Sequence, residues 1–118
     1  MGFVKVKVGL YNPLQPEKVI KVDAVVNTGA VYSVVGRDFL EKLGVKPLGR
    51  KRFRVFGGYV ERDVGEVGMI LLGERRIVSV IFGEEGEAVV IGVTALEIFG
   101  LEVDVVRGTL KEAELILL

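Results

Sequence analysis

The sequence predicts an all-β domain, rich in strands and carrying one or two short helices. Half of its 118 residues are hydrophobic, and 16 glycines divide the chain into short apolar runs. Short β-branched runs bounded by glycine are typical of strands joined by tight turns. The length suits one domain, and no linker or low-complexity tract interrupts it, so residues 1–118 are expected to form a single domain.

Residues 3–10 and 52–56 show alternation of apolar and polar residues with a period of two, and the other expected strands are short runs rich in β-branched or apolar residues. They span residues 3–10, 19–26, 31–35, 52–56, 59 onward, 64–72, 75–82, 88–91, 102–105 and 110–117. Two other segments, 37–43 and 94–99, place apolar residues on one helical face. Each is followed by a glycine, Gly44 or Gly100, where a helix C-cap glycine belongs.

Turn residues connect these strands. Two prolines within residues 12–16 end the first strand. Hairpin turns are expected at Gly57-Gly58, at Gly73-Glu74 and at residues 107–109. An apolar strand, a glycine corner and a short helix ending in glycine occur twice along the chain, which indicates a weak internal duplication.

The charge balance and the missing residue types exclude several classes of function. Basic and acidic residues both number 16, so the chain has no long-range attraction to nucleic acid or to an anionic membrane. Without His or Cys, Ser-His-Asp catalysis, disulfides and most zinc sites are excluded. We expect no metal and no cofactor. The N-terminus does not resemble a signal peptide and no apolar run approaches the ~18 residues of a membrane span, so a cytoplasmic location is expected. The lack of Cys and the many charged residues suit a thermophile.

Two charged clusters have simple interpretations. Residues 50–54 are basic around Phe53, as nucleic-acid patches can be, but the alternation is that of any solvent-facing strand. We therefore expect no nucleic-acid partner. Residues 84–87 are acidic but lack the ligand spacing of a calcium loop, so they are interpreted as a turn.

Residues 25–30 are the most informative motif. They read Val-Val-Asn-Thr-Gly-Ala, which matches the hydrophobic-hydrophobic-Asp-Thr-Gly-Ala pattern of aspartic proteases except at Asn27. The apolar corner at 89–92 and the segment 95–104 resemble the second half of such proteins, and residues 56–59 lie where their flap hairpin would be. The chain thus resembles the retropepsin-like aspartic proteases, of the archaeal and prokaryotic single-domain type, over nearly its whole length.

The resemblance implies an acid-protease half-barrel that works as a homodimer. With one motif per chain, an identical subunit must supply the second copy across a two-fold axis. The apolar run 115–118 supports such an interface, because exposed apolar strands aggregate unless paired. The implied partners are this second subunit and a peptide or unfolded protein substrate, with no membrane partner.

The resemblance also implies the site residues. Asn27 occupies the position of the catalytic aspartate, and Thr28 and Gly29 complete the catalytic motif. The implied substrate contacts are Ala30, Val31, Tyr32, Gly57, Gly58, Tyr59 and Val90. Each has a simpler interpretation: a turn at Asn27, a plain hairpin at Gly57-Gly58, a surface aromatic at Tyr59, strand residues at Val31 and Tyr32, and a core residue at Val90.

Asn27 decides what this chain can do. Two carboxyl groups sharing one proton can activate water and polarise a peptide carbonyl, whereas an amide cannot take water's proton. Asp23 lies about 13 Å away along the same strand and cannot replace it. We expect an aspartic endopeptidase dimer that is inactive as written and active after Asn27→Asp. The alternative is a naturally non-catalytic peptide-binding or dimerisation module. Asn27 is either native or engineered, and the intact motif around it favours engineering.

Overall fold

The computed structural model describes residues 4–118, which form a β-rich fold with two short helices, as predicted. In chain order the elements are β1 (Val4–Asn12), β2 (Gln15–Val26), β3 (Ser33–Gly36), α1 (Arg37–Lys42), β4 (Gly49–Val55), β5 (Gly58–Leu71), β6 (Glu74–Gly83), β7 (Val89–Ile91), α2 (Val93–Phe99), β8 (Leu101–Asp104) and β9 (Thr109–Glu112).

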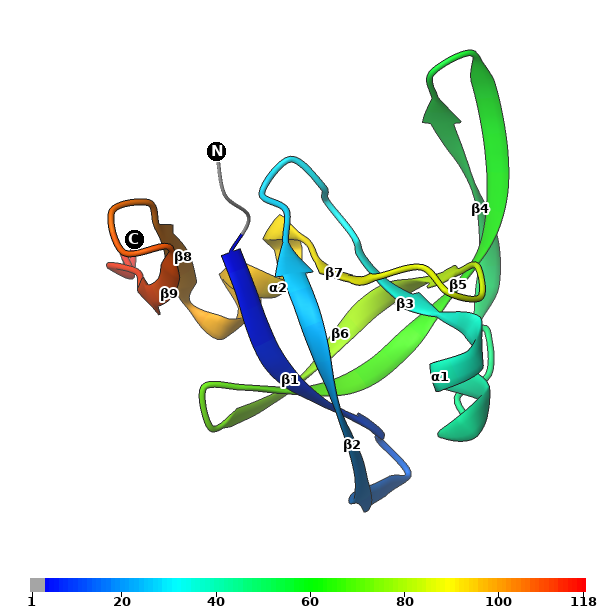
Figure 1. The fold of residues 1–118 in the computed structure, drawn as a ribbon, viewed down its shortest axis with the longest axis horizontal. Helices are drawn as coiled ribbons and strands as arrows, with labels where there is room; N and C mark the ends of the chain where they lie inside the picture. The colour runs from blue at the N-terminus through cyan, green and yellow to red at the C-terminus, as the bar shows by residue number, and fades with distance from the viewer. Residues whose placement is uncertain (1–3) are drawn as a thin grey trace.

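Seven of these strands form one sheet that curls into a barrel (Figure 1). Its strand order is β1-β2-β7-β3-β6-β5-β4, and β1 also pairs with β5 through Gly9 and Ile70, which closes the sheet on itself. The outer part of β5 continues beyond the barrel and pairs only with β4, so these two strands project as a long hairpin (Figure 1). We call this β4–β5 projection the flap hairpin.

The two apolar strands that end in glycine corners lie side by side in the sheet. β2 and β7 run parallel, with Val25 opposite Val90 and Val26 opposite Ile91. β3 pairs with the other edge of β7, so β7 is inserted between two strands that are neighbours in the sequence. Because parallel strands end at the same edge, the two corners meet at one end of the barrel.

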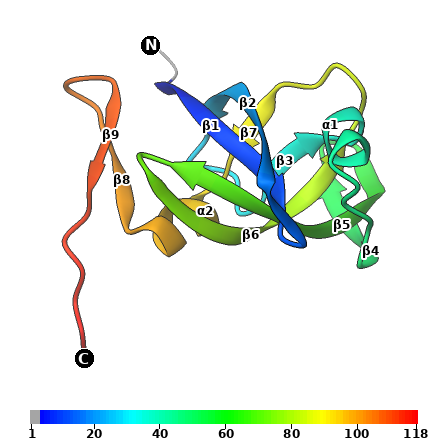
Figure 2. The same cartoon turned by 90° about the horizontal axis from the view of Figure 1, so that it is seen from below.

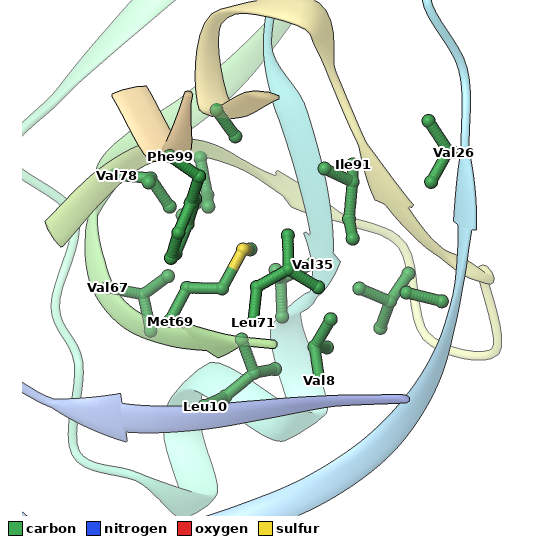
Figure 3. Close-up of a cluster of buried hydrophobic side chains, with 14 of the residues drawn as sticks. Val8, Leu10, Val26, Val35, Val67, Met69, Leu71, Val78, Ile91 and Phe99 are labelled. Carbon is green, nitrogen blue, oxygen red and sulfur yellow. The ribbon is translucent and has the colours of Figure 1, made fainter. Parts of the chain in front are cut away.

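Alternate residues of the strands fill the barrel interior (Figure 3). In β1, for example, Val4 and Val8 are buried and Val6 is half-buried, while Lys5 and Lys7 between them face solvent. The period of two predicted from the sequence is therefore the period of burial. The helices add Leu40 and Leu96 to the same core. A buried side chain of this size contributes roughly 1.5–3 kcal/mol relative to exposure, which makes the barrel a firm base for its loops.

Several expected boundaries are wrong. The segments expected as separate strands at 59 onward and 64–72 are one strand, β5, and the strand expected at 31–35 begins only at Ser33. The second hairpin turns at Leu72 and Gly73 rather than one residue later, with positive φ angles of 49° and 81°. Leucine is uncommon at positive φ, so sequence preference favoured the wrong turn register.

The end of the chain also differs from expectation. The strand expected over 110–117 ends at Glu112, and the segment after it leaves the barrel as an extended tail (Figure 2). The four apolar side chains of residues 115–118 are all exposed, Leu118 completely. Within one chain nothing pairs with this run in the described residues. No helix of residues 4–118 is long and apolar enough to cross a membrane.

Candidate functional site

Asn27 lies at the end of β2, where the strand gives way to an exposed turn. Its backbone N–H donates a hydrogen bond of 3.0 Å to the carbonyl oxygen of Ile91 in β7, and its own carbonyl accepts one of 3.1 Å from Ala30. The side-chain Oδ1 accepts a further bond of 2.9 Å from the N–H of Gly29. A carboxylate oxygen would accept the same bond, so the turn suits Asp as well as Asn.

The motif residues differ in exposure. Asn27, Thr28 and Gly29 are exposed and Ala30 is half-buried. Asp23, the nearest carboxylate along β2, is also exposed and forms an ion pair of 2.7 Å with Lys7. Thus the only functional groups that the turn itself presents are the Asn27 amide, the Thr28 hydroxyl and backbone groups.

The second glycine corner is hydrogen-bonded to the end of the motif turn. The N–H of Val93 donates to the carbonyl of Ala30 at 2.7 Å, and that of Thr94 donates to Val31 at 3.3 Å. A side chain at Gly92 would lie 2.6 Å from the Tyr32 carbonyl, so glycine is required for this close approach. The resemblance at residues 89–92 therefore corresponds to direct contact between the two corners.

Ser33 is a site residue that sequence reasoning missed. It is the only buried polar side chain among the described residues, 1% exposed, and its Oγ accepts a 2.9 Å hydrogen bond from the N–H of Gly92. The signal was a single serine inside the apolar run 31–35, because a buried hydroxyl needs a hydrogen-bond partner.

Val90 is not the core residue that was its simplest interpretation. Its neighbours Val89 and Ile91 are buried in the barrel, so alternation turns Val90 to the opposite face, where it is half-buried. Val25 is opposite Val90 in β2, and Val34 is opposite it in β3. These three valines form a partly exposed apolar strip on the outer face of the corner strands.

The flap hairpin reaches the motif segment through an aromatic contact. The rings of Tyr32 and Phe53 meet edge to face with centroids 5.8 Å apart. Phe53 is paired with Val60 across the hairpin, and paired residues of an antiparallel ladder share a face. Phe53 and Val60 therefore define the inner face of the flap hairpin. Both were missed from the sequence, where they look like ordinary strand residues.

Tyr59 lies on the other face. It is paired with Arg54, one position along from Val60, and its ring is covered by the Arg52 guanidinium 4.6 Å from the centroid. The hairpin expected to turn at Gly57-Gly58 turns one residue earlier, at Phe56 and Gly57, because Gly58 is already the first residue of β5 and pairs with Val55. Gly57 has a φ of 89°, and Phe56 is completely exposed. Of the predicted flap contacts, Tyr59 thus points away from the face that touches Tyr32.

A cluster of charges fixes the base of the flap hairpin. The Asp63 carboxylate accepts hydrogen bonds from Arg37 in α1 at 2.6 Å and from Arg50 in β4 at 2.9 Å. The hydrogen bond from Arg37 is the largest influence on the pKa of Asp63 and, with that from Arg50, holds it below its usual value, although partial burial opposes this shift. This carboxyl is therefore charged over the whole neutral and mildly acidic range.

The motif lies on open surface. Surface hollows of ≈ 480, 400 and 330 Å³ lie elsewhere, beside Leu14 and Leu48, beside Ile70 and Leu72, and beside Asp63, and none includes a residue of 27–30. In residues 4–118 no three metal-ligating side chains gather. One chain alone thus presents the motif on its surface, with the flap hairpin in contact with the following segment through Tyr32 and Phe53.

Comparison with known proteins shows the fold. The chain superposes on the protease of EIAV in complex with an inhibitor with a TM-score of 0.64 and 17% identity, over 98% of this chain and 94% of that one. It superposes on the solution structure of simian foamy virus protease with a TM-score of 0.61 and 16% identity, over 80% and 93%. The chain therefore has the retropepsin-like fold of retroviral proteases. No family model matches the sequence, and no curated protein does.

Proposed function

We propose that this chain is one subunit of a homodimeric aspartic endopeptidase of the single-domain archaeal and prokaryotic type. In the active form each subunit supplies one aspartate at position 27 to a shared site. With Asn27 the dimer binds peptide in the same cleft and hardly cleaves it.

The placement of Asn27 carries this proposal. The residue projects from a turn held by hydrogen bonds to β7 and to Gly29, at the barrel end where two corners meet. In a retropepsin-like fold, such a turn can present the side chain at position 27 to a second copy of the chain, because the turn lies on an open surface. A second copy facing it would supply the other half of the cleft and the other side chain.

The chemistry follows from two aspartates held side by side. They cannot both ionise easily, so the pair keeps one proton to a higher pH than isolated carboxyls do. The charged member takes a proton from water, whose oxygen attacks the peptide carbonyl, and the neutral member donates its hydrogen bond to the carbonyl oxygen. The amide nitrogen then takes a proton from the dyad, and the C–N bond breaks to release the amine and the new carboxyl group.

Asn27 removes both roles while preserving the shape of the site. The amide accepts the Gly29 hydrogen bond as a carboxylate would, but cannot act as a general base. A substitution made to trap substrate or to prevent self-cleavage would account for a protease motif in which an amide nitrogen replaces one carboxylate oxygen. The second candidate function, a natural peptide-binding or dimerisation module, is favoured by the Asn27 amide itself.

The test is a digest of an unfolded protein by the Asn27 and Asn27→Asp forms between mildly acidic and neutral pH. We expect the Asp form to cleave best at acidic pH and the Asn form to be slower by at least roughly 10²–10⁴, the usual cost of losing a general base. Asn27→Ala should be as inactive as Asn27. Adding Asp23→Asn to the Asp form should change the cleavage rate little, because Asp23 forms an ion pair with Lys7.

A negative result has a definite meaning. If the Asn27→Asp form has the mass of a dimer and yet cleaves neither the unfolded protein nor a broad peptide library, the protease proposal fails. Peptide binding by that form would then support the binding-module function.

A further inference from the structure

We infer that the outer face of the flap hairpin, defined by Arg52, Arg54 and Tyr59, is a docking surface for acidic segments of polypeptides. This inference rests on the proposed function in that it describes the substrates which the flap would select. It concerns the face turned away from Tyr32, and so a surface separate from the cleft.

The register of the hairpin places these three side chains together. Arg54 is the direct cross-strand partner of Tyr59, and Arg52 lies two residues before Arg54 on the same face. The Arg52 guanidinium stacks over the Tyr59 ring at 4.6 Å, although Glu61 is its cross-strand partner. Stacking on an aromatic ring holds a guanidinium flat while leaving its N–H edge free to bind a carboxylate.

Charge is concentrated here in a chain that is neutral overall. Residues 50–54 include four of the 16 basic residues. Within residues 4–118, ion pairs to carboxylates engage Arg50 and Arg62 of this hairpin but not Lys51, Arg52 or Arg54. Asp63 at the base is already satisfied by two arginines. The outer face therefore presents the guanidinium groups of Arg52 and Arg54 without ion-pair partners in the described residues, with the exposed carboxylate of Glu61 as the one acidic group opposite Arg52.

The geometry fits a polypeptide. Arg52 and Arg54 are two residues apart on a strand, about 7 Å, which is also the spacing of alternate side chains in an extended peptide. Two carboxylates at such positions can each meet one guanidinium, with apolar contact to Tyr59, whose side chain is 58% exposed. A nucleic acid would need a longer basic surface to bind through its phosphates, and the neutral chain lacks one.

Docking at this face would raise the local concentration of a substrate near the cleft. The two faces belong to the same two-stranded ladder, so a polypeptide bound to the outer face has a neighbouring segment available to the inner face. Substrates with an acidic segment next to an apolar one are thus expected to be favoured over short neutral peptides.

The first test measures binding by the full chain with Asn27, which requires no cleavage. The probe is a fluorescent peptide with Glu at alternate positions, compared with its Gln counterpart by anisotropy at low ionic strength. We expect the Glu peptide to bind more tightly, and the Arg52→Glu, Arg54→Glu double variant to weaken it about tenfold or more. The control is Lys5→Glu, Lys21→Glu, which changes net charge equally on β1 and β2, away from the hairpin.

Each outcome bears on the inference. Equal weakening by the control pair would show that net charge alone matters, and would overturn it. Equal affinity for the Glu and Gln peptides, or tighter binding of a single-stranded oligonucleotide, would overturn it as well. Arg52→Gln, Arg54→Gln repeats the test without introducing repulsion.

The second test uses the Asn27→Asp form and compares a neutral peptide with the same peptide carrying an acidic extension. The Arg52, Arg54 variant should lower kcat/KM for the extended peptide and leave the neutral one unchanged. A form that cleaves neither peptide contradicts the proposed function while the binding result stands. Cleavage of both with equal loss contradicts the docking surface.

Discussion

Asp63 shows how one carboxylate can fix the position of a whole element. It is 15% exposed, and it joins α1, β4 and β5 through Arg37 and Arg50. Each arginine neutralises part of the charge, so the carboxylate is stable at the base of a hairpin that otherwise has little packing. Ser33 stabilises the glycine corner after β7, where its hydroxyl oxygen accepts a hydrogen bond from the N–H of Gly92.

Because the pKa of Asp63 is lowered on folding, its contribution to stability should depend on pH. A lowered folded-state pKa means that the contribution is complete above the unfolded value of about 4 and disappears as pH falls through the folded value. We expect Asp63→Asn to lower the free energy of unfolding at pH 7, and the difference from the parent protein to shrink below about pH 4.

Denaturant unfolding of both proteins at pH 7 and across the acidic range checks this. Glu61→Gln is the control, since Glu61 is exposed on the same strand and forms no ion pair within residues 4–118. A difference between Asp63→Asn and the parent that is constant down to the lowest pH would contradict the assigned pKa shift.

The flap hairpin is the element with least support from the barrel. Its side chains over residues 49–63 are at best half-buried, and two adjacent glycines, Gly57 and Gly58, lie at its tip. The other long hairpin, β5–β6, is anchored by buried Leu71 and Val78 close to its turn. Local opening is least costly where few apolar contacts are lost, so the two ends of β5 should differ in mobility.

We therefore predict that the flap amides of residues 52–61 exchange with deuterium faster than those of residues 69–78. A bound peptide should slow exchange in the flap, because the inner face carrying Phe53 and Val60 gains contacts. Equal protection of the two hairpins in the free protein would show that the flap is as rigid as the barrel.

At the scale of the whole molecule, the barrel is closed, but many apolar side chains outside it remain exposed to solvent. The exposed residues 115–118, with Val105 and Val106 of the β8–β9 turn, give one end of the chain a large share of its exposed apolar side chains. Exposed apolar side chains in such number are candidates for an interaction surface. A second copy would cover it and would also face the motif turn.

We predict a stable homodimer in solution, with an interface of at least about 2,000 Å², as permanent dimers typically have. Light scattering should give twice the chain mass at micromolar concentration. Ending the chain after Ala113 should yield monomers, whereas Leu14→Ser, Leu48→Ser, which removes exposed leucines elsewhere, should leave the dimer intact. A folded monomer of the complete chain at that concentration would contradict the dimer.

Much of the element pattern was readable from the sequence. Period-two alternation over residues 3–10 predicted that the valines and lysines of β1 face opposite ways, and Val4 and Val8 are buried while Lys5 and Lys7 are exposed. Glycine after the second apolar helical run predicted its end, and at Gly100 the φ of 69° shows why, since only glycine adopts that angle freely. The motif at residues 25–30 located the candidate site because a tight turn leaves few choices of residue.

Contacts between distant segments were decided by the tertiary structure alone. The insertion of β7 between β2 and β3, the closure of the barrel by Gly9 and Ile70, and the Tyr32–Phe53 contact join residues that no local pattern links. Alternation predicts that a strand has two faces, but it does not predict which residues each face contacts. For that reason the sequence identified the flap hairpin, whereas only the folded chain assigned Phe53 to its inner face and Tyr59 to its outer one.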